Sequence, residues 1–310
     1  MVDTFSKSLI QPAAGIPPDM ELSVMMGAMV WVLIASRIGL PVSTTHALTG
    51  ALVGSALTAF GGHGFVWPTI IGKIALPLLL SPVLALALST LIHPLIRSVA
   101  DRWEGSCLCL MPESRALVTI DVRGATRTLY QTTAFGRPIT DVPANCDRAG
   151  LRGLTIGLDA IHWTPTGFAS LARGTNDAPK LIAILLMGAS ASSSVTPIAW
   201  TVAFFGVALA MGSGSYLGGL RVTQVLAEGV TRIDHAEGLS ANLTTSTLVL
   251  VSATMGLPVS TTHVSSSAII GIGLLKGHTA VSWSTVRTMV LAWLARCQSL
   301  NCSLLLSILP

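Results

Sequence analysis

The sequence predicts an all-α, polytopic membrane protein made of two related, inverted halves, each with a re-entrant hairpin that contains a half-helix. The first observation is composition: of 310 residues, 51% are hydrophobic and 10% are charged. Average soluble domains carry about 25% charged residues, so this chain has too few charges to cover a globular surface in water. The second observation is an octapeptide, Gly-Leu-Pro-Val-Ser-Thr-Thr-His, that occurs at 39–46 and again at 256–263. The third is a series of apolar runs long enough to cross a bilayer.

The first predicted element is a membrane helix over 22–38. Gly39 and Pro41 end this helix, since proline cannot continue a helix but suits the first turn of a new one. A short half-helix with two glycines is expected to follow over 46–59. A long span over 70–96 contains Pro77 and Pro82 in its interior and is therefore expected to be kinked.

The middle of the chain, 97–152, breaks this apolar pattern. Eight arginines and six acidic residues lie there. Cytoplasmic loops of membrane proteins are enriched in Lys and Arg. We therefore predict an Arg-rich cytoplasmic linker that joins a partial first repeat at 1–96 to a second repeat at 153–310.

The second repeat is predicted to contain several apolar spans and another half-helix, which cover 155–187, 195–211, 239–255, 260–275 and the region from Trp283 onward. Its similarity to the first repeat extends beyond the octapeptide. Trp67-Pro-Thr-Ile resembles Trp283-Ser-Thr-Val at nearly the same offset (283 − 67 = 216, against 256 − 39 = 217). Because about 20 apolar residues cross a bilayer, we expect roughly six to eight helical passages, counting the half-helices.

The two octapeptides are the strongest candidates for a binding site. Interrupted helices at matching positions of two repeats are typical of the substrate sites of transporters. Hydroxyl groups and free N–H groups at a helix start, together with the positive end of the helix dipole, can hold an anion. Two such starts that face each other can bind a small tetrahedral oxyanion from both sides. The residues concerned are Ser43, Thr44, Thr45, Ser260, Thr261 and Thr262, with His46 and His263 beside them.

A purely structural interpretation of the octapeptides stays open. Serine and threonine hydroxyls often bond back to their own helix. In that case His46 and His263 would only join neighbouring helices.

A second candidate site is Gly174-Thr-Asn-Asp, followed by Pro179. A carboxylate at membrane depth generally marks a functional site. We expect an unwound helix in which Asn176 and Asp177 hold a hard cation such as Na⁺, or in which Asp177 carries a proton. The alternative is a salt bridge from Asp177 to Arg173 or Lys180 at a helix end. If both sites work together, a bound cation cancels the repulsion between Asp177 and an oxyanion, so each ligand raises the affinity for the other.

Several classes of function are excluded by what the sequence lacks. It contains no Gly-rich phosphate loop, no nucleophile elbow and no His-Glu-x-x-His motif. We therefore predict that the protein is not an enzyme and uses no cofactor beyond a coupling Na⁺ or H⁺. The net charge of +4 is explained by basic cytoplasmic loops, and no basic patch with aromatic residues indicates nucleic acid.

In these motifs the chain resembles the inorganic phosphate transporter (PiT) family, whose two halves each carry a Gly-x-Asn-Asp element and a Pro-Val-Ser-Thr-Thr-His element. The resemblance implies a symporter of inorganic phosphate. It implies phosphate binding by the Ser-Thr-Thr segments and cation coupling, tentatively with Na⁺, by Asn176 and Asp177. Some relatives carry sulfate, so a sulfate permease of the same fold is the alternative.

One element of the family pattern has no counterpart. Asp177 precedes Ser260 by 83 residues, and the same spacing from Ser43 falls before Met1 (43 − 83 = −40). We therefore expect a chain that is shortened at its N-terminus, and a membrane protein that does not transport is a further alternative. The expected surroundings are a lipid bilayer, as a multi-pass protein of a bacterial inner membrane, with a homodimer as one arrangement.

Overall fold

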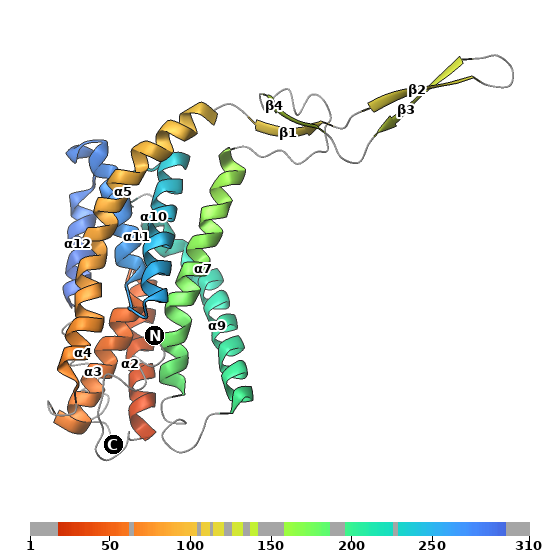
Figure 1. Ribbon diagram of the computed structural model, residues 1–310. Coiled ribbons are helices and arrows are strands. Elements are labelled where there is room, and N and C mark those ends of the chain that lie inside the picture. The colour runs from red at the N-terminus through yellow and green to blue at the C-terminus, as the bar shows by residue number, and fades with distance from the viewer. Residues whose placement is uncertain are drawn as a thin grey trace.

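The computed structural model shows a bundle of helices with a thin extension at one end (Figure 1). The bundle confirms the predicted helical membrane fold class. The re-entrant placement of the half-helices in a bilayer stays a prediction. The structure describes residues 18–61, 65–103, 107–111, 114–120, 126–132, 137–141, 158–186, 196–225 and 229–295.

The first part of the bundle consists of two helices and one longer span. Helix α2 covers Pro18–Arg37, and α3 covers Thr44–Phe60. The long span then begins with α4, Trp67–Thr69, passes through the π-helical segment η2, Ile70–Ala75, and continues as α5, Leu76–Trp103. A π-helical turn is a recognised cause of helix bending. The span ends later than predicted, because α5 continues past Arg97 and Arg102 of the linker region and ends at Trp103.

The second part of the bundle repeats this arrangement after two additional helices. Its helices are α7 (Leu158–Leu185), α9 (Pro197–Gln224), α10 (His235–Thr254), α11 (Thr261–Leu275), the single 3-10 turn η4 (His278–Ala280) and α12 (Trp283–Ala295).

The duplicated sequence folds into duplicated helices. Helices α2 and α10 each have 20 residues, and both their starts and their ends lie 217 positions apart (235 − 18 = 254 − 37 = 217). Helices α3 and α11 also begin 217 positions apart (261 − 44 = 217). The octapeptide thus marks the break in a helix–break–helix unit that occurs twice.

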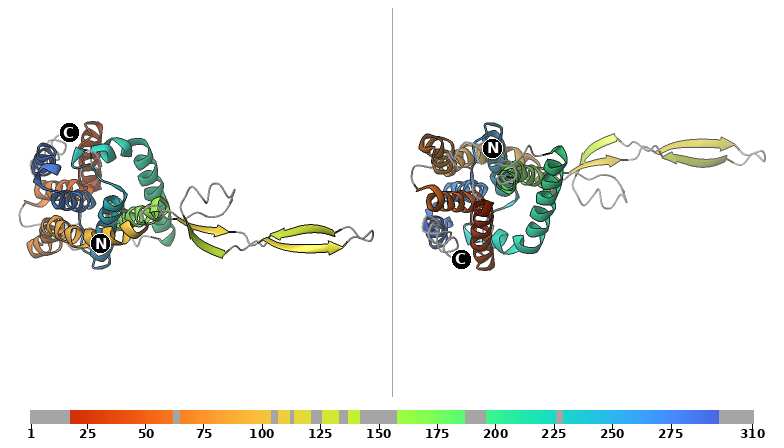
Figure 2. Two further views of the ribbon diagram at one scale, coloured as in Figure 1. Left: turned by 90° about the horizontal axis from the view of Figure 1, so that it is seen from above. Right: turned by 90° about the horizontal axis from the view of Figure 1, so that it is seen from below.

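The linker between the repeats contains strands, which the sequence analysis did not predict. Strand β1 (Cys107–Met111) pairs antiparallel with β4 (Arg137–Asp141), in a register that places Cys107 opposite Asp141. Strand β2 (Ser114–Ile120) pairs antiparallel with β3 (Thr126–Thr132). Figure 2 shows both pairs projecting away from the helices. The cytoplasmic location of this linker stays a prediction.

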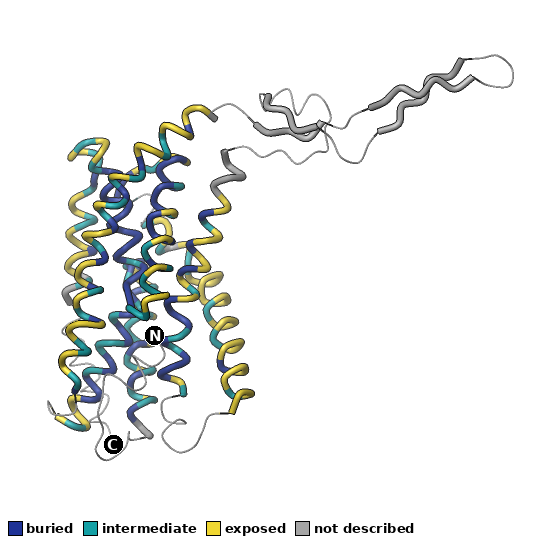
Figure 3. Tube along the Cα trace, in the orientation of Figure 1, coloured by how far each residue is buried: buried dark blue, intermediate teal, exposed yellow. Residues whose placement is uncertain are grey.

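Helix α11 lies in the centre of the bundle and α9 at its edge (Figures 2 and 3). The helix α11 is buried over most of its length and packs closely against α5. A Cβ atom on Gly271 would lie 2.3 Å from Ser89 Oγ and 2.7 Å from the carbonyl oxygen of Leu86. Small residues allow this kind of close helix approach in membrane proteins.

Three helices of the described part are long and apolar enough to cross a membrane, namely Met20–Arg37, Trp67–Arg102 and Pro197–Leu220. Helix α11 is apolar but shorter. Large apolar side chains on the outer faces of α5 and α9 are exposed, among them Leu91 and Leu217. Exposed apolar side chains in such numbers suit a lipid environment.

Candidate functional site: two paired helix starts

Each copy of the octapeptide forms the same backbone structure. We call residues 39–46 the first tip and residues 256–263 the second tip. In the first tip, Gly39 has a φ of 74° and its N–H donates to the carbonyl of Ser36 at 3.2 Å, while Leu40 N–H donates to Ala35 at 2.9 Å. This is a Schellman ending, which places glycine in the left-handed region.

The second tip repeats this ending. Gly256 has a φ of 71°, and its N–H donates to Ala253 at 3.1 Å. Leu257 N–H donates to Ser252 at 2.9 Å. The glycine at the start of the octapeptide therefore ends one helix in both copies, as the sequence predicts.

The serine of each tip then caps the next helix. Ser43 Oγ accepts a hydrogen bond from His46 N–H, and Ser260 Oγ accepts one from His263 N–H, both at 3.2 Å. Serine is a favoured N-cap residue, and these bonds show both serines in that role. The Ser260 hydroxyl keeps its own hydrogen for donation, whereas Ser43 Oγ also lies 3.0 Å from the ring Nδ1 of His46.

The two tips contact each other through reciprocal hydrogen bonds. Thr45 Oγ1 of the first tip donates to the carbonyl oxygen of Val259 in the second, at 3.0 Å. Thr262 Oγ1 of the second tip donates to the carbonyl oxygen of Val42 in the first, at 2.9 Å. Each threonine and each valine has its counterpart 217 positions away. A reciprocal exchange of this kind is what a local twofold axis produces.

Aromatic rings reinforce the contact between the tips. The rings of His46 and His263 lie with their centroids 4.5 Å apart. Trp293 of α12 places its ring 4.0 Å from that of His263 and donates its Nε1–H to the carbonyl of Pro41 at 3.3 Å. Trp293 therefore touches both tips, although nothing in the sequence singles it out for this position.

Helix α7 adds a polar cluster to this junction. Asn176 Nδ2 donates to Asp177 Oδ1 at 2.8 Å and to the carbonyl of Val259 at 3.0 Å. Lys180 Nζ donates to Asp177 Oδ1 at 3.1 Å and also to Thr45 Oγ1. Lys180 is fully buried, and Asp177 is 9% exposed. The predicted cation-coupling pair therefore lies directly against the junction of the tips.

The expected unwinding of the helix at Asn176 and Asp177 is wrong. Both residues lie inside the continuous helix α7, which also contains Pro165 and Pro179. Internal prolines remove hydrogen bonds from a helix but do not end it where neighbouring helices support the backbone. The cluster therefore presents side-chain oxygens from α7, and its backbone carbonyl comes from the second tip.

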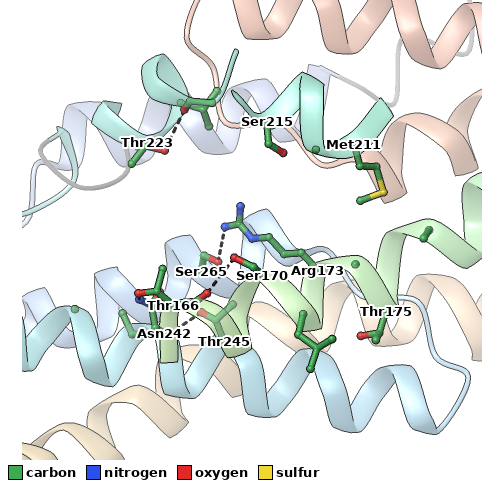
Figure 4. A pocket seen from close by; sticks show the side chains of 18 of the residues that line it. Thr166, Ser170, Arg173, Thr175, Met211, Ser215, Thr223, Asn242, Thr245 and Ser265 are labelled. Carbon is green, nitrogen blue, oxygen red and sulfur yellow. Dashed lines mark hydrogen bonds between the residues drawn. The ribbon is translucent and has the colours of Figure 1, made fainter. Parts of the chain in front are cut away.

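Arg173 takes part in a different environment. Its side chain is exposed and points into a cavity of about 1250 Å³ between α7, α9, α10 and α11 (Figure 4). Its Nη2 lies 3.5 Å from Ser265 Oγ, on the helix that follows the second tip. Of the two basic partners considered for Asp177, the described contacts show Lys180 in that role. Arg173 instead gives the cavity wall a positive charge beside Gly174 and Thr175.

The remaining predicted residues, Thr44 and Thr261, are the first residues of α3 and α11. Thr44 is half-buried and Thr261 is buried. Their N–H groups belong to the first helical turn, which has no intrahelical acceptors. Each tip therefore ends in N–H groups and hydroxyls at the positive end of a helix dipole.

Sequence reasoning missed the two valine carbonyls, Trp293 and Ser265. Every residue has a backbone carbonyl, so the residue type does not indicate which carbonyl takes part in a site. Ser265 belongs to the small-residue segment after the second octapeptide, and that segment is the signal that could have indicated it.

Comparisons with known proteins place the chain among related sequences. A family model described as the phosphate transporter family matches residues 1–306. A Mycobacterium leprae protein named "Probable low-affinity inorganic phosphate transporter" is 28% identical over 296 residues, which cover 94% of this chain and 60% of that protein. A Pyrococcus horikoshii protein that carries the name of a phosphate permease is 26% identical over 331 residues, covering 94% of this chain and 79% of the relative.

A solved structure titled "The sodium-dependent phosphate transporter" has a similar fold, with a TM-score of 0.68 and 20% identity. The match covers 100% of this chain and 85% of that one. The chain spans about 60% of the length of the mycobacterial relative. Its apolar helices and its relatives identify an integral membrane protein. From the match along nearly its whole length, the chain belongs to the phosphate transporter family.

Proposed function

We propose that this chain is a secondary transporter that moves inorganic phosphate across a membrane, coupled to Na⁺ or H⁺, in the inner membrane of a bacterium. The observation that carries the proposal is the pair of reciprocal hydrogen bonds between the tips, Thr45 to Val259 and Thr262 to Val42. They bring two helix starts with identical sequences to one place. The family membership and the names of the relatives support phosphate as the substrate.

The tips suit an oxyanion that must be released again. Neither octapeptide contains Lys or Arg. Binding would rely on helix dipoles, N–H groups and the hydroxyls of Ser43 and Ser260. Such contacts attract an anion without a fixed positive charge in the tips themselves, so capture and release can both occur.

The cluster on α7 supplies a means of coupling. Asp177 lies beside the second tip, and an uncompensated carboxylate there would repel an oxyanion. A positive charge held by this carboxylate removes the repulsion. Phosphate binding and the charge state of the cluster are then linked, and each one favours the other by the same factor.

Uptake of labelled phosphate into proteoliposomes tests the proposal. We expect uptake by the wild-type chain, competed by unlabelled phosphate more strongly than by sulfate. Thr261→Ala and Asp177→Asn should each reduce the rate per folded protein by at least about tenfold, the effect of losing one hydrogen bond to a charged group. Thr201→Ala is a matched control, because Thr201 is exposed on α9 and its hydroxyl, among the described contacts, donates back to the carbonyl of Pro197.

The alternatives give different results in the same assay. A sulfate permease would take up labelled sulfate and show little competition by phosphate. A membrane protein that does not transport would show no uptake of either anion above empty vesicles. Full activity in both site variants would refute the assignment of the site.

A further inference from the structure

We propose that Lys180 takes the place of a coupling Na⁺ ion beside Asp177, so that transport by this chain does not depend on Na⁺. The inference rests on the proposed function, in which Asn176 and Asp177 respond to the coupling ion, and it narrows the choice of that ion.

The ammonium group of Lys180 contacts the oxygens that a Na⁺ ion would need. Its Nζ lies 2.5 Å from Thr45 Oγ1, 3.1 Å from Asp177 Oδ1 and 3.4 Å from the carbonyl oxygen of Val259. A hydroxyl, a carboxylate and a free carbonyl are the oxygen ligands that hard cations prefer. An ammonium group has three N–H donors, and each of the three has one acceptor here. The centre of this oxygen cluster is therefore filled by the side chain.

The orientation of Asn176 also disfavours a Na⁺ ion. Its Nδ2 donates to Asp177 Oδ1 and to Val259, and its Oδ1 lies 3.5 Å from the N–H of Val259. The amide oxygen, which is the atom that would bind a cation, is therefore directed toward a backbone donor. Its NH₂ group is directed toward the carboxylate.

The charge balance of the cluster is complete without an added ion. Lys180 is 0% exposed and Asp177 is 9% exposed, so water screens neither charge well. The negative charge of Asp177 already has a positive partner within hydrogen-bond distance. A Na⁺ ion bound to the same carboxylate would lie close to a buried ammonium group, and like charges repel strongly where the local dielectric constant is low. The described residues therefore do not fit Na⁺ at this position.

Binding of ²²Na⁺ to the purified full chain in detergent tests this directly. Three proteins are compared: the wild type, Lys180→Ala, and the double variant Asp177→Asn with Lys180→Met, which removes both charges together. We expect Lys180→Ala to bind one more Na⁺ per chain than the other two, because it leaves the three oxygens without their cation. The wild type and the double variant should bind the same amount.

Two binding results would overturn the inference. One is a Na⁺ ion that the wild type binds and the double variant lacks. The other is a folded Lys180→Ala that binds no additional Na⁺. If Lys180→Ala does not fold, the comparison of the wild type with the double variant still tests the inference, because equal Na⁺ binding by these two proteins is expected.

Transport separates this inference from the proposed function. Phosphate uptake is measured under one fixed pH gradient, with either Na⁺ or choline as the salt. We expect less than about a twofold difference for the wild type, whereas a true Na⁺ symporter would lose at least about tenfold in choline. A tenfold loss would overturn the inference and leave phosphate transport standing. Absence of uptake in both salts would contradict the proposed function. The ²²Na⁺ binding comparison alone would then test whether Lys180 occupies the place of a Na⁺ ion.

Discussion

The two tips have the same eight residues and the same backbone, but they differ in their surroundings. Val259, Thr261 and His263 of the second tip are buried, while their counterparts 217 positions earlier are half-buried. The carbonyl of Val259 accepts hydrogen bonds from three side chains, from α3 and α7. The corresponding carbonyl of Val42 accepts one in the described part of the chain.

This difference shows which properties a duplicated motif carries with it. The glycine, the serine cap and the cross-tip threonine depend on local sequence and on the partner tip, so they recur in both copies. The ionic cluster depends on α7, whose Asn176 and Lys180 both donate to the carbonyl of Val259 in the second tip, whereas its described hydrogen bond to the first tip runs from Lys180 to Thr45. The cluster therefore contacts both tips, and more of its described hydrogen bonds go to the second.

The largest effect is expected from removing the buried carboxylate of the cluster on α7. Asp177→Asn leaves the buried ammonium of Lys180 without its counter-charge. Breaking a buried ion pair in this way costs about 3–5 kcal/mol. The free energy of unfolding in detergent should fall by that amount, and it should recover substantially when Lys180→Met is added.

Asp101→Asn is the matched control for this prediction. Asp101 pairs with Arg97 at 2.9 Å, but the two side chains are 53% and 42% exposed. An exposed pair contributes at most about 1 kcal/mol. Equal losses from the two asparagine substitutions would mean that the cluster at the second tip is not a buried ion pair.

A somewhat smaller loss is expected from Gly271→Ala, in the helix that follows the second tip. The added methyl group would overlap with the backbone of α5 at Leu86, which cannot move aside as a flexible side chain can. Overpacking of this kind costs about 1–3 kcal/mol. Thermal unfolding of the purified protein measures it.

Gly50→Ala, in the helix that follows the first tip, is the control for Gly271→Ala. A Cβ there has no atom within 4 Å. Alanine should therefore stabilise this helix by about 0.5–1 kcal/mol, because it restricts the unfolded chain and favours the helix. If both alanines destabilise equally, the close contact of α11 with α5 is not the cause.

The two cross-tip threonines provide a sharper comparison. Thr45→Val removes a hydroxyl that donates to Val259 and accepts from Lys180. Because the buried ammonium group then loses one of its hydrogen-bond partners, we expect the free energy of unfolding to fall by about 2–3 kcal/mol. Thr262→Val removes the equivalent bond to Val42 alone and should cost about 1 kcal/mol. Denaturant titrations of the two variants measure the difference. Equal losses of stability in the two variants would show that the contact of Thr45 with Lys180 of α7 adds nothing to the bond between the tips.

A small effect is also expected at the glycine of the first tip. Gly39 has a φ of 74°, which costs a residue with a side chain about 1–2 kcal/mol. The neighbouring Val225 methyl lies at an ordinary 3.8 Å from the added Cβ, so the backbone angle alone should determine the loss. Gly39→Ala should therefore lower stability by about 1 kcal/mol in a thermal melt. A variant as stable as the wild type would contradict the left-handed turn.

Local features of both tips could be predicted from the sequence. Glycine, proline and serine at fixed offsets specify a helix end followed by a capped helix start, and the duplication predicts that this happens twice. The capping by Ser43 and Ser260 and the breaks after α2 and α10 follow from these short-range rules.

Features that depend on packing between distant segments could not be predicted. Asn176 lies 83 residues before Val259 in sequence, and only the packing of α7 against α10 brings them together. The motif at Asn176 suggested an unwound helix because of Pro179, but neighbouring helices keep α7 continuous. The linker strands were missed because the Arg-rich composition was interpreted as a polar loop.

The central claim is that the two tips form one anion site and not two. Equilibrium binding of labelled phosphate to the purified chain, to Ser43→Ala and to Ser260→Ala tests it most directly. We predict one phosphate per wild-type chain, and a loss of affinity of at least about tenfold in each variant, since each tip contributes to the same site. Two phosphates per chain, with each serine variant losing one and binding the other at wild-type affinity, would contradict the account.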